Sequence, residues 1–153
     1  MNKFIISTLF AGILLLGACS EDKEEFDTEA PTISVEYPTP CAIEKFGDMI
    51  RLKANLSDNE GLGSYKLNIH HNFDHHTHGN HQEVCEMDEI KTATNPFLKD
   101  WSASLPNEKS MVLDTSFQLP ADMQGGDYHA LLYVTDINGN QSWTGISIKI
   151  IEN

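Results

Sequence analysis

Residues 126–151 read GDYHALLYVTDINGNQSWTGISIKII, and this stretch decides the fold class. On both sides of Asn138 and Gly139, apolar residues alternate with polar ones. Such an alternation of period two turns one face of a strand toward a core. Asn-Gly is typical of tight hairpin turns, because both residues tolerate positive φ. The stretch therefore predicts two antiparallel, half-buried strands, 127–135 and 143–151, joined by a hairpin.

The same alternation recurs upstream, and no stretch after Pro31 has the apolar spacing of a helix. The further expected strands are 32–37, 49–57, 64–70 and 110–119. After the second of these strands, Asp58-Asn59-Glu60-Gly61 indicates a turn. Strands in this order predict an all-β fold, an immunoglobulin-like Greek-key β-sandwich of about seven strands.

The sequence resembles known proteins at two levels, in its last hairpin and over the whole chain. The segment 126–140 resembles the final hairpin of bacterial immunoglobulin-like domains. The chain as a whole resembles an uncharacterised family of Bacteroidota lipoproteins that carry such a domain. This resemblance covers nearly the whole mature length. It implies the sandwich fold but no established activity.

The N-terminus has the layout of a secretory signal. Lys3 is followed by an apolar run that is too short to cross a bilayer. The run ends in Leu16-Gly17-Ala18-Cys19, which resembles the lipobox of bacterial lipoproteins. The alternative is an ordinary signal peptide that happens to end near a cysteine. We expect a signal peptide over 1–18, lipidation of Cys19, a flexible acidic tether over 19–30 and the sandwich domain over 31–153.

The lipid on Cys19 would make the membrane a partner of the chain. The acidic run 20–25 resembles the surface-export signal of Bacteroidota lipoproteins. We therefore expect an outer-membrane lipoprotein exposed on the cell surface, with the periplasmic face of that membrane as the alternative. Removal of residues 1–18 takes the formal net charge from −13 to −14, since Lys3 is the only charge lost. So acidic a chain cannot neutralise phosphates, and nucleic acid is not an expected partner.

Six of the seven histidines fall within residues 70–81. Neutral imidazole is a common ligand of zinc, copper and nickel, and a site needs three or four such donors. The alternative is a polar loop without a defined site. We expect a zinc or copper ion, with ligands drawn from this segment: His70, His71, Asp74, His75, His76, His78 and His81.

His129 extends this hypothesis. In an immunoglobulin-type sandwich, strands 64–70 and 127–135 are antiparallel neighbours. Tyr128 points inward in this scheme, so His129 points outward at the same end as His70. We therefore add His129 to the expected ligands.

Three cysteines are present, and Cys19 is assigned to lipid. Cys41 and Cys85 remain as an even pair in a compartment that permits disulfides. Cys41 lies in the connection that reaches the histidine end, so a disulfide would hold the histidine-rich segment to the sandwich. The alternative makes both thiolates metal ligands, as in structural zinc sites.

Other candidate sites are weaker. Acids and amides in the turns at the opposite end of the sandwich can bind calcium or satisfy their own backbone. These residues are Asp58, Glu60, Asp136 and Asn138. Three aromatic residues are candidates for ligand stacking. We expect Phe97 and Trp101 to pack in the core or anchor a loop, and we leave stacking as a role for Trp143.

No catalytic role is expected. Residues 76–81 resemble the HxHxDH signature of metallo-β-lactamase-like hydrolases, but Asn80 stands where the aspartate belongs, and that fold needs a longer chain. No Gly-rich phosphate loop or Gly-x-Ser-x-Gly turn is present. The leading hypothesis is a lipid-anchored binding protein that captures or senses a divalent transition metal. The alternative is a structural or adhesive surface module with a glycan or protein partner.

Overall fold

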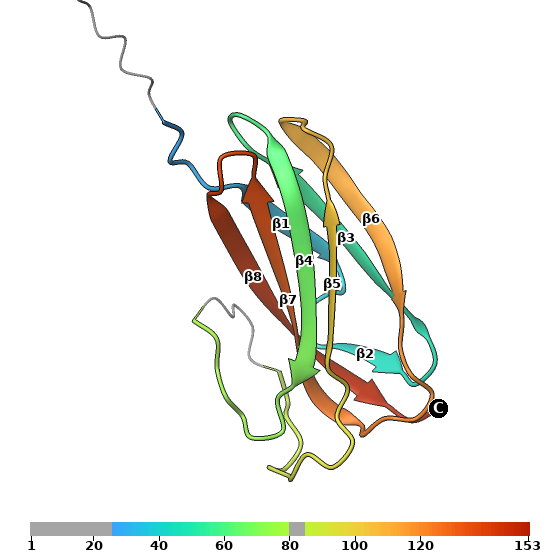
Figure 1. Cartoon of the computed structure of the whole chain (residues 1–153). Coiled ribbons are helices and arrows are strands. Elements are labelled where there is room, and N and C mark those ends of the chain that lie inside the picture. The colour runs from blue at the N-terminus through green and yellow to red at the C-terminus, as the bar shows by residue number, and fades with distance from the viewer. Residues whose placement is uncertain (1–25, 80–84) are drawn as a thin grey trace, which may run out of the picture.

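The computed structural model describes residues 26–79 and 85–153, and every regular element in them is a strand (Figure 1). In this part of the chain, no helix is long and apolar enough to cross a membrane. The strands are β1 (Thr32–Tyr37), β2 (Ala42–Lys45), β3 (Met49–Ser57), β4 (Leu62–His71), β5 (Lys99–Ser104), β6 (Ser110–Gln118), β7 (Gly126–Asp136) and β8 (Gln141–Ile151).

The strands form two sheets. One has the order β1-β3-β6 and the other the order β2-β8-β7-β4-β5. All pairs are antiparallel except β2 with β8. Most consecutive strands lie in different sheets, as in Greek-key sandwiches, while β4–β5 and β7–β8 each stay within one sheet. The immunoglobulin-like sandwich predicted from the alternation is confirmed, with β4 and β7 as neighbours.

Two strands were missing from the sequence prediction. β2 has four residues and lies within the connection from β1 to β3, so its alternation is too short to recognise. β5 is an edge strand that pairs only with β4, and five of its six residues are exposed. An edge strand with little burial has no apolar face, and the period-two signal is therefore absent.

The core lies between the sheets and is built from the inward-facing residues of the long strands. Most of its buried members come from β3, β4, β7 and β8. They include Ile50, Leu52, Ala54, Leu56, Leu67, Ile69, Tyr128, Ala130, Leu132, Val134, Ile148 and Ile150. These are the positions that the alternation selects, which is why the sequence identified the core well.

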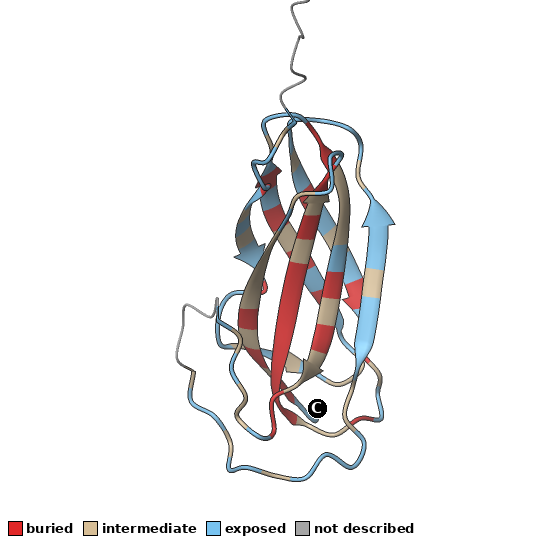
Figure 2. Ribbon diagram, turned by 60° about the vertical axis from the view of Figure 1, so that its left-hand side comes forward, coloured by how far each residue is buried: buried red, intermediate tan, exposed pale blue. Residues whose placement is uncertain are grey.

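β7 differs from its neighbours because it is buried on both faces over most of its length (Figure 2). The outward-facing side chains of Asp127, His129 and Leu131 are at most 7% exposed. The chain that follows β4 lies over this face, where the backbone N–H of Asp88 donates to Asp127 Oδ2 at 2.7 Å. One end of the outer sheet face is therefore covered by a loop.

Tyr128 fastens a second loop to the core. Its hydroxyl donates to the carbonyl of Gln124 at 2.5 Å and accepts from the N–H of Phe97 at 3.1 Å. We expect Tyr128→Phe to lower the free energy of unfolding by about 1–2 kcal/mol, because both backbone groups lose a buried partner. Denaturant unfolding measures this, with Tyr133→Phe on the outer face as control. Equal stability of the two variants would contradict the assignment.

Candidate metal centre

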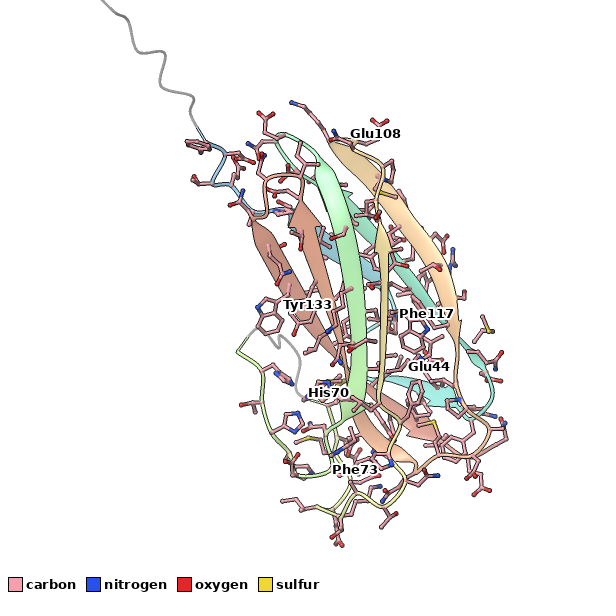
Figure 3. The ribbon with its side chains drawn as sticks, in the orientation of Figure 1. Glu44, His70, Phe73, Glu108, Phe117 and Tyr133 are labelled. Atoms are coloured by element: carbon pink, nitrogen blue, oxygen red, sulfur yellow. A yellow bond between two sulfur atoms is a disulfide. The ribbon has the colours of Figure 1, made fainter. Side chains whose placement is uncertain are left out.

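The site begins with a cross-strand pair of histidines. His70 and His129 are directly opposite each other in the ladder between β4 and β7. Both point away from the core, because Ile69 and Tyr128 next to them point inward. Figure 3 shows His70 at the end of β4, where the chain turns into the histidine loop, residues 72–79. The strand order predicted from the sequence thus brings these two rings together.

The histidine loop folds back over this pair and adds two more rings. His75 has a φ of 60°, a left-handed conformation that reverses the chain direction. The four imidazoles form what we call the histidine centre, in which the ligand nitrogens all lie within 4.8 Å of one another. Its members are His70, His76, His78 and His129.

The rings of the histidine centre are arranged as a tetrahedron. His70 Nε2 lies 3.2 Å from His76 Nε2 and 3.0 Å from His78 Nε2. The six centroid separations among the four rings range only from 5.0 to 5.5 Å. Four points whose six separations are nearly equal are the corners of a tetrahedron, so the rings surround one common point.

Two hydrogen bonds set which nitrogen of each ring faces the centre. His70 Nδ1 donates to Asn68 Oδ1 at 2.6 Å, and Asn68 Nδ2 donates to Asp100 at 2.7 Å, which fixes the orientation of the amide. His76 Nδ1 donates to Asp74 Oδ1 at 2.6 Å. With the proton on Nδ1, a neutral ring directs the lone pair of Nε2 inward.

The surroundings of the histidine centre disfavour a charged ring at His78. His129 is only 1% exposed. Burial, and second the nearby His76, lower the pKa of His78 below its usual value, since both disfavour a charged ring. A neutral imidazole is the form that binds a metal.

A cavity of about 600 Å³ lies beside the histidine centre, between the histidine loop and the β8 side of the sheet. Three of the four rings, those of His76, His78 and His129, form part of its wall, together with Ile148 and Lys149. The centre is therefore reached from this cavity.

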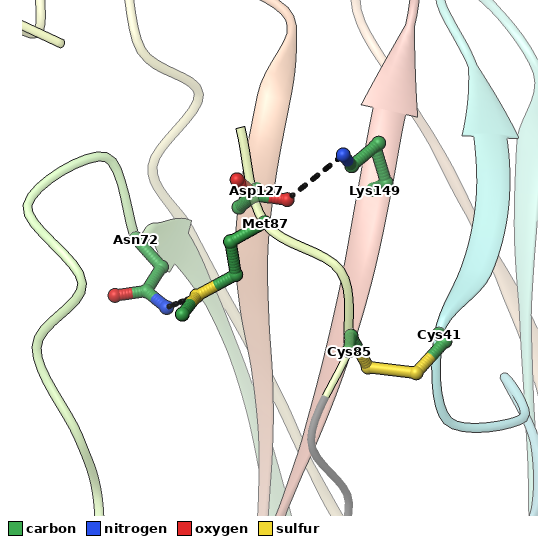
Figure 4. The surroundings of a disulfide bond; sticks show 6 residues. All are labelled: Cys41, Asn72, Cys85, Met87, Asp127 and Lys149. Carbon is green, nitrogen blue, oxygen red and sulfur yellow. Dashed lines mark hydrogen bonds and ion pairs between the residues drawn. A yellow bond between two sulfur atoms is a disulfide. The ribbon is translucent and has the colours of Figure 1, made fainter. Parts of the chain in front are cut away.

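A disulfide closes the far side of the cavity. Cys41 and Cys85 are bonded, with their Cα atoms 5.5 Å apart (Figure 4). Because the two sulfurs bond each other, the alternative in which both serve as thiolate ligands is wrong. Two residues after Cys85, Met87 accepts a hydrogen bond from Asn72 at 3.6 Å, so the bridge also supports the start of the histidine loop.

A family model described as a domain of unknown function, DUF4625, matches residues 17–151. The chain belongs to the DUF4625 family. No curated protein matches it.

Solved structures resemble the fold of this DUF4625 domain at low identity. A DUF4466 family protein from Parabacteroides merdae is 14% identical with a TM-score of 0.52, over 79% of this chain and 44% of that one. OgpA from Akkermansia muciniphila, solved with an O-glycopeptide substrate, is 13% identical with a TM-score of 0.49, over 85% and 32%.

The CARDB domain of a Pyrococcus furiosus protein, in complex with di-metal ions, is 16% identical with a TM-score of 0.38, over 84% and 98%. The DUF4625 chain spans less than half the length of the first two structures. At 14% identity the likeness to the DUF4466 protein shows a shared fold alone.

The DUF4625 domain does not bring all expected ligands together. His71 follows His70 on the strand and so faces the other way, where its ring contacts Phe73 at 4.9 Å. His75 Nε2 donates to the carbonyl of Asp88 at 2.9 Å and anchors the histidine loop. Asp74 orients His76 and is not itself in the group. His81 and Cys19 lie outside the described residues.

Acidic residues gather at the opposite end of the sandwich. Carboxylate oxygens of Asp27, Asp58 and Asp136 lie within 4.8 Å of one another. Asp58 Oδ1 accepts from the N–H groups of Glu60 and Gly61. Asp136 Oδ1 accepts two more backbone N–H groups in the hairpin turn that contains Asn138. Asp58 and Asp136 therefore satisfy backbone N–H groups of their own turns, one of the two roles that the sequence leaves open for these acids.

The aromatic candidates divide in the same way. The ring of Trp101 lies 5.9 Å from that of Phe97 and 4.5 Å from that of Phe117, and all three pack against the core. Trp143 lies on the outer sheet face, 6.0 Å from Tyr133 and 6.4 Å from His78. Phe97 and Trp101 are therefore structural, and Trp143 borders the histidine centre.

Proposed function

We propose that this DUF4625 protein captures a divalent transition metal ion, zinc or copper, at the histidine centre. The proposal is supported by one observation above the others, the convergence of inward-directed nitrogens. His70 and His76 carry their protons on Nδ1, so two Nε2 lone pairs face each other at 3.2 Å. Lone pairs at this distance repel unless a proton or metal cation lies between them. A divalent cation satisfies all four rings at once.

The binding reaction can be followed on the exported chain, purified without a polyhistidine tag. We expect native mass spectrometry after zinc addition to show a complex of one ion per chain. A chelator should return the chain to its metal-free mass, because imidazole ligands exchange. A chain that gains no mass, or that gains a broad distribution of several ions, would refute a single site.

Asp74 provides a test outside the ligands themselves. Its carboxylate accepts from His76 Nδ1, and that hydrogen bond lowers the pKa of Asp74. Loss of such an orienting partner costs about 10–100-fold in metal affinity. We expect this loss for Asp74→Asn in a zinc titration. Asp114→Asn, which breaks an ion pair with Arg51 on the other sheet, should leave the affinity unchanged. Equal affinities for both variants would contradict the orienting role.

We propose further that Cys19 carries a lipid and that the protein is an outer-membrane lipoprotein on the cell surface. The described chain joins the sandwich at the acidic end, where Asp27 accepts hydrogen bonds from Asn59 and Asn138 (Figure 1). The histidine centre lies at the other end of β4 and β7. In this arrangement the metal site faces away from the membrane.

Site-specific labels test this orientation in membrane-bound protein. A label near Asn138 should be quenched from the lipid phase more strongly than a label near Thr77. Stronger quenching near Thr77 would show that the assumed anchor or orientation is wrong.

A further inference from the structure

We infer that the histidine centre is a closed tetrahedral site for Zn²⁺ that discriminates against Ni²⁺ and copper. This inference rests on the proposed function and specifies its metal. Zn²⁺ takes four ligands at the corners of a tetrahedron in closed sites. Cu²⁺ and Ni²⁺ with nitrogen ligands favour square-planar or tetragonal arrangements. The positions of the four rings separate these possibilities.

The separations of the rings agree with a tetrahedral site. Zinc–nitrogen bonds of 2.0–2.1 Å place tetrahedral nitrogens about 3.4 Å apart and ring centroids about 5.2 Å apart. The measured nitrogen separations are 3.0 and 3.2 Å, and the centroid separations are 5.0–5.5 Å. In a square-planar site, two of the six centroid separations would rise to about 6.4 Å. None of the six exceeds 5.5 Å.

Parts of the backbone that carry the ligands are anchored. His70 and His129 are paired in the β4–β7 ladder. The histidine loop is held ahead of His76, since Asn72 N–H donates to the carbonyl of Asp127 at 2.8 Å and His75 donates to the carbonyl of Asp88 at 2.9 Å. Discrimination among divalent metals comes from geometry more than from raw affinity. A tetrahedron already formed by the chain therefore penalises metals that prefer a plane or an octahedron.

Two chemical features complete the assignment to zinc. Cu⁺ tolerates a tetrahedron but prefers sulfur ligands, and the histidine centre supplies only nitrogens. Four protein ligands also fill the coordination sphere, so no position remains for a metal-activated water. The adjoining cavity gives the ion an entry path to the site. The site is thus suited to holding and exchanging zinc, not to catalysis.

Cobalt provides a spectroscopic test, because tetrahedral Co²⁺ absorbs strongly in the visible and octahedral Co²⁺ absorbs weakly. We expect the exported chain, free of a polyhistidine tag, to give the strong bands with one equivalent of Co²⁺. Zn²⁺ should abolish these bands at one equivalent. In competition titrations Zn²⁺ should bind more tightly than Ni²⁺ by at least about tenfold. His71→Ala is the control and should keep the spectrum.

The outcomes distinguish this inference from the proposed function. If none of the ions Co²⁺, Zn²⁺, Ni²⁺ and Cu²⁺ binds, both the proposed function and this inference fail. If one ion binds but Co²⁺ gives the weak octahedral spectrum, the proposed function stands and the tetrahedral site is overturned. Binding of Ni²⁺ as tight as that of Zn²⁺ overturns it too, since this is the behaviour of a flexible histidine tract.

Discussion

Replacing His76 and His78 together by alanine is expected to abolish stoichiometric zinc binding, with a loss of affinity well above the roughly 100-fold ceiling for an orienting residue. The two rings are half of the histidine centre, and the two that remain, on β4 and β7, supply too few ligands. Both residues are on the histidine loop, so the sandwich itself should fold. Isothermal titration calorimetry measures the loss.

The matched control is His71→Ala, which removes a histidine from the same stretch of sequence. The ring of His71 contacts Phe73 and lies outside the histidine centre. We expect the control to keep one zinc ion per chain. If the control loses zinc as the double variant does, binding depends on histidine content and the assigned centre is wrong.

In the unaltered chain, acid should weaken zinc binding as the substitution of His76 and His78 does. Protons compete with the metal for imidazole nitrogens, so zinc affinity should fall as the pH drops through about 6.5. The same calorimetric titration at neutral and acidic pH measures this. An affinity that does not change over this range would exclude histidine ligands.

The second large effect is expected at the disulfide. Replacing both Cys41 and Cys85 by serine removes a cross-link between residues 44 positions apart, worth about 4 kcal/mol on the chain-entropy model. For a domain of this size, the melting temperature should fall by roughly 15 °C. Thermal unfolding of the metal-free chain measures this loss without a contribution from zinc.

Two controls make the disulfide result interpretable. Reduction of the unaltered chain should lower its melting temperature to that of the serine variant, because both remove the same cross-link. In exported, denatured and non-reduced protein carrying Cys19→Ala, we expect no free thiols. Two free thiols per chain, or a serine variant as stable as the oxidised chain, would contradict the structural role of the bond.

The sequence predicted those features that follow from regular periodicity. Alternation identified the inward positions of the long strands, and the pairing of β4 with β7 placed His129 beside His70. With Cys19 assigned to lipid, the cysteine count left Cys41 and Cys85 as the pair. In each of these cases a local pattern and one rule of sandwich topology suffice.

The rest depends on irregular backbone, for which the sequence has no periodic signal. The sequence of residues 74–78 does not predict that the side chains of His76 and His78 turn inward while His75 anchors the histidine loop. The left-handed conformation of His75 decides this, and it arises from long-range contacts such as that with Asp88. The roles of Asn68 and Asp100 behind His70 were missed for the same reason.

X-ray absorption at the zinc edge of the zinc-loaded, exported chain tests the central claim most directly. It reports the type, number and distance of the atoms around the ion. We predict four nitrogen neighbours at about 2.0–2.1 Å, with the outer-shell scattering of imidazole rings and no sulfur. A sulfur neighbour near about 2.3 Å, a shell of more than four light atoms, or a chain that retains no zinc would contradict the proposed centre.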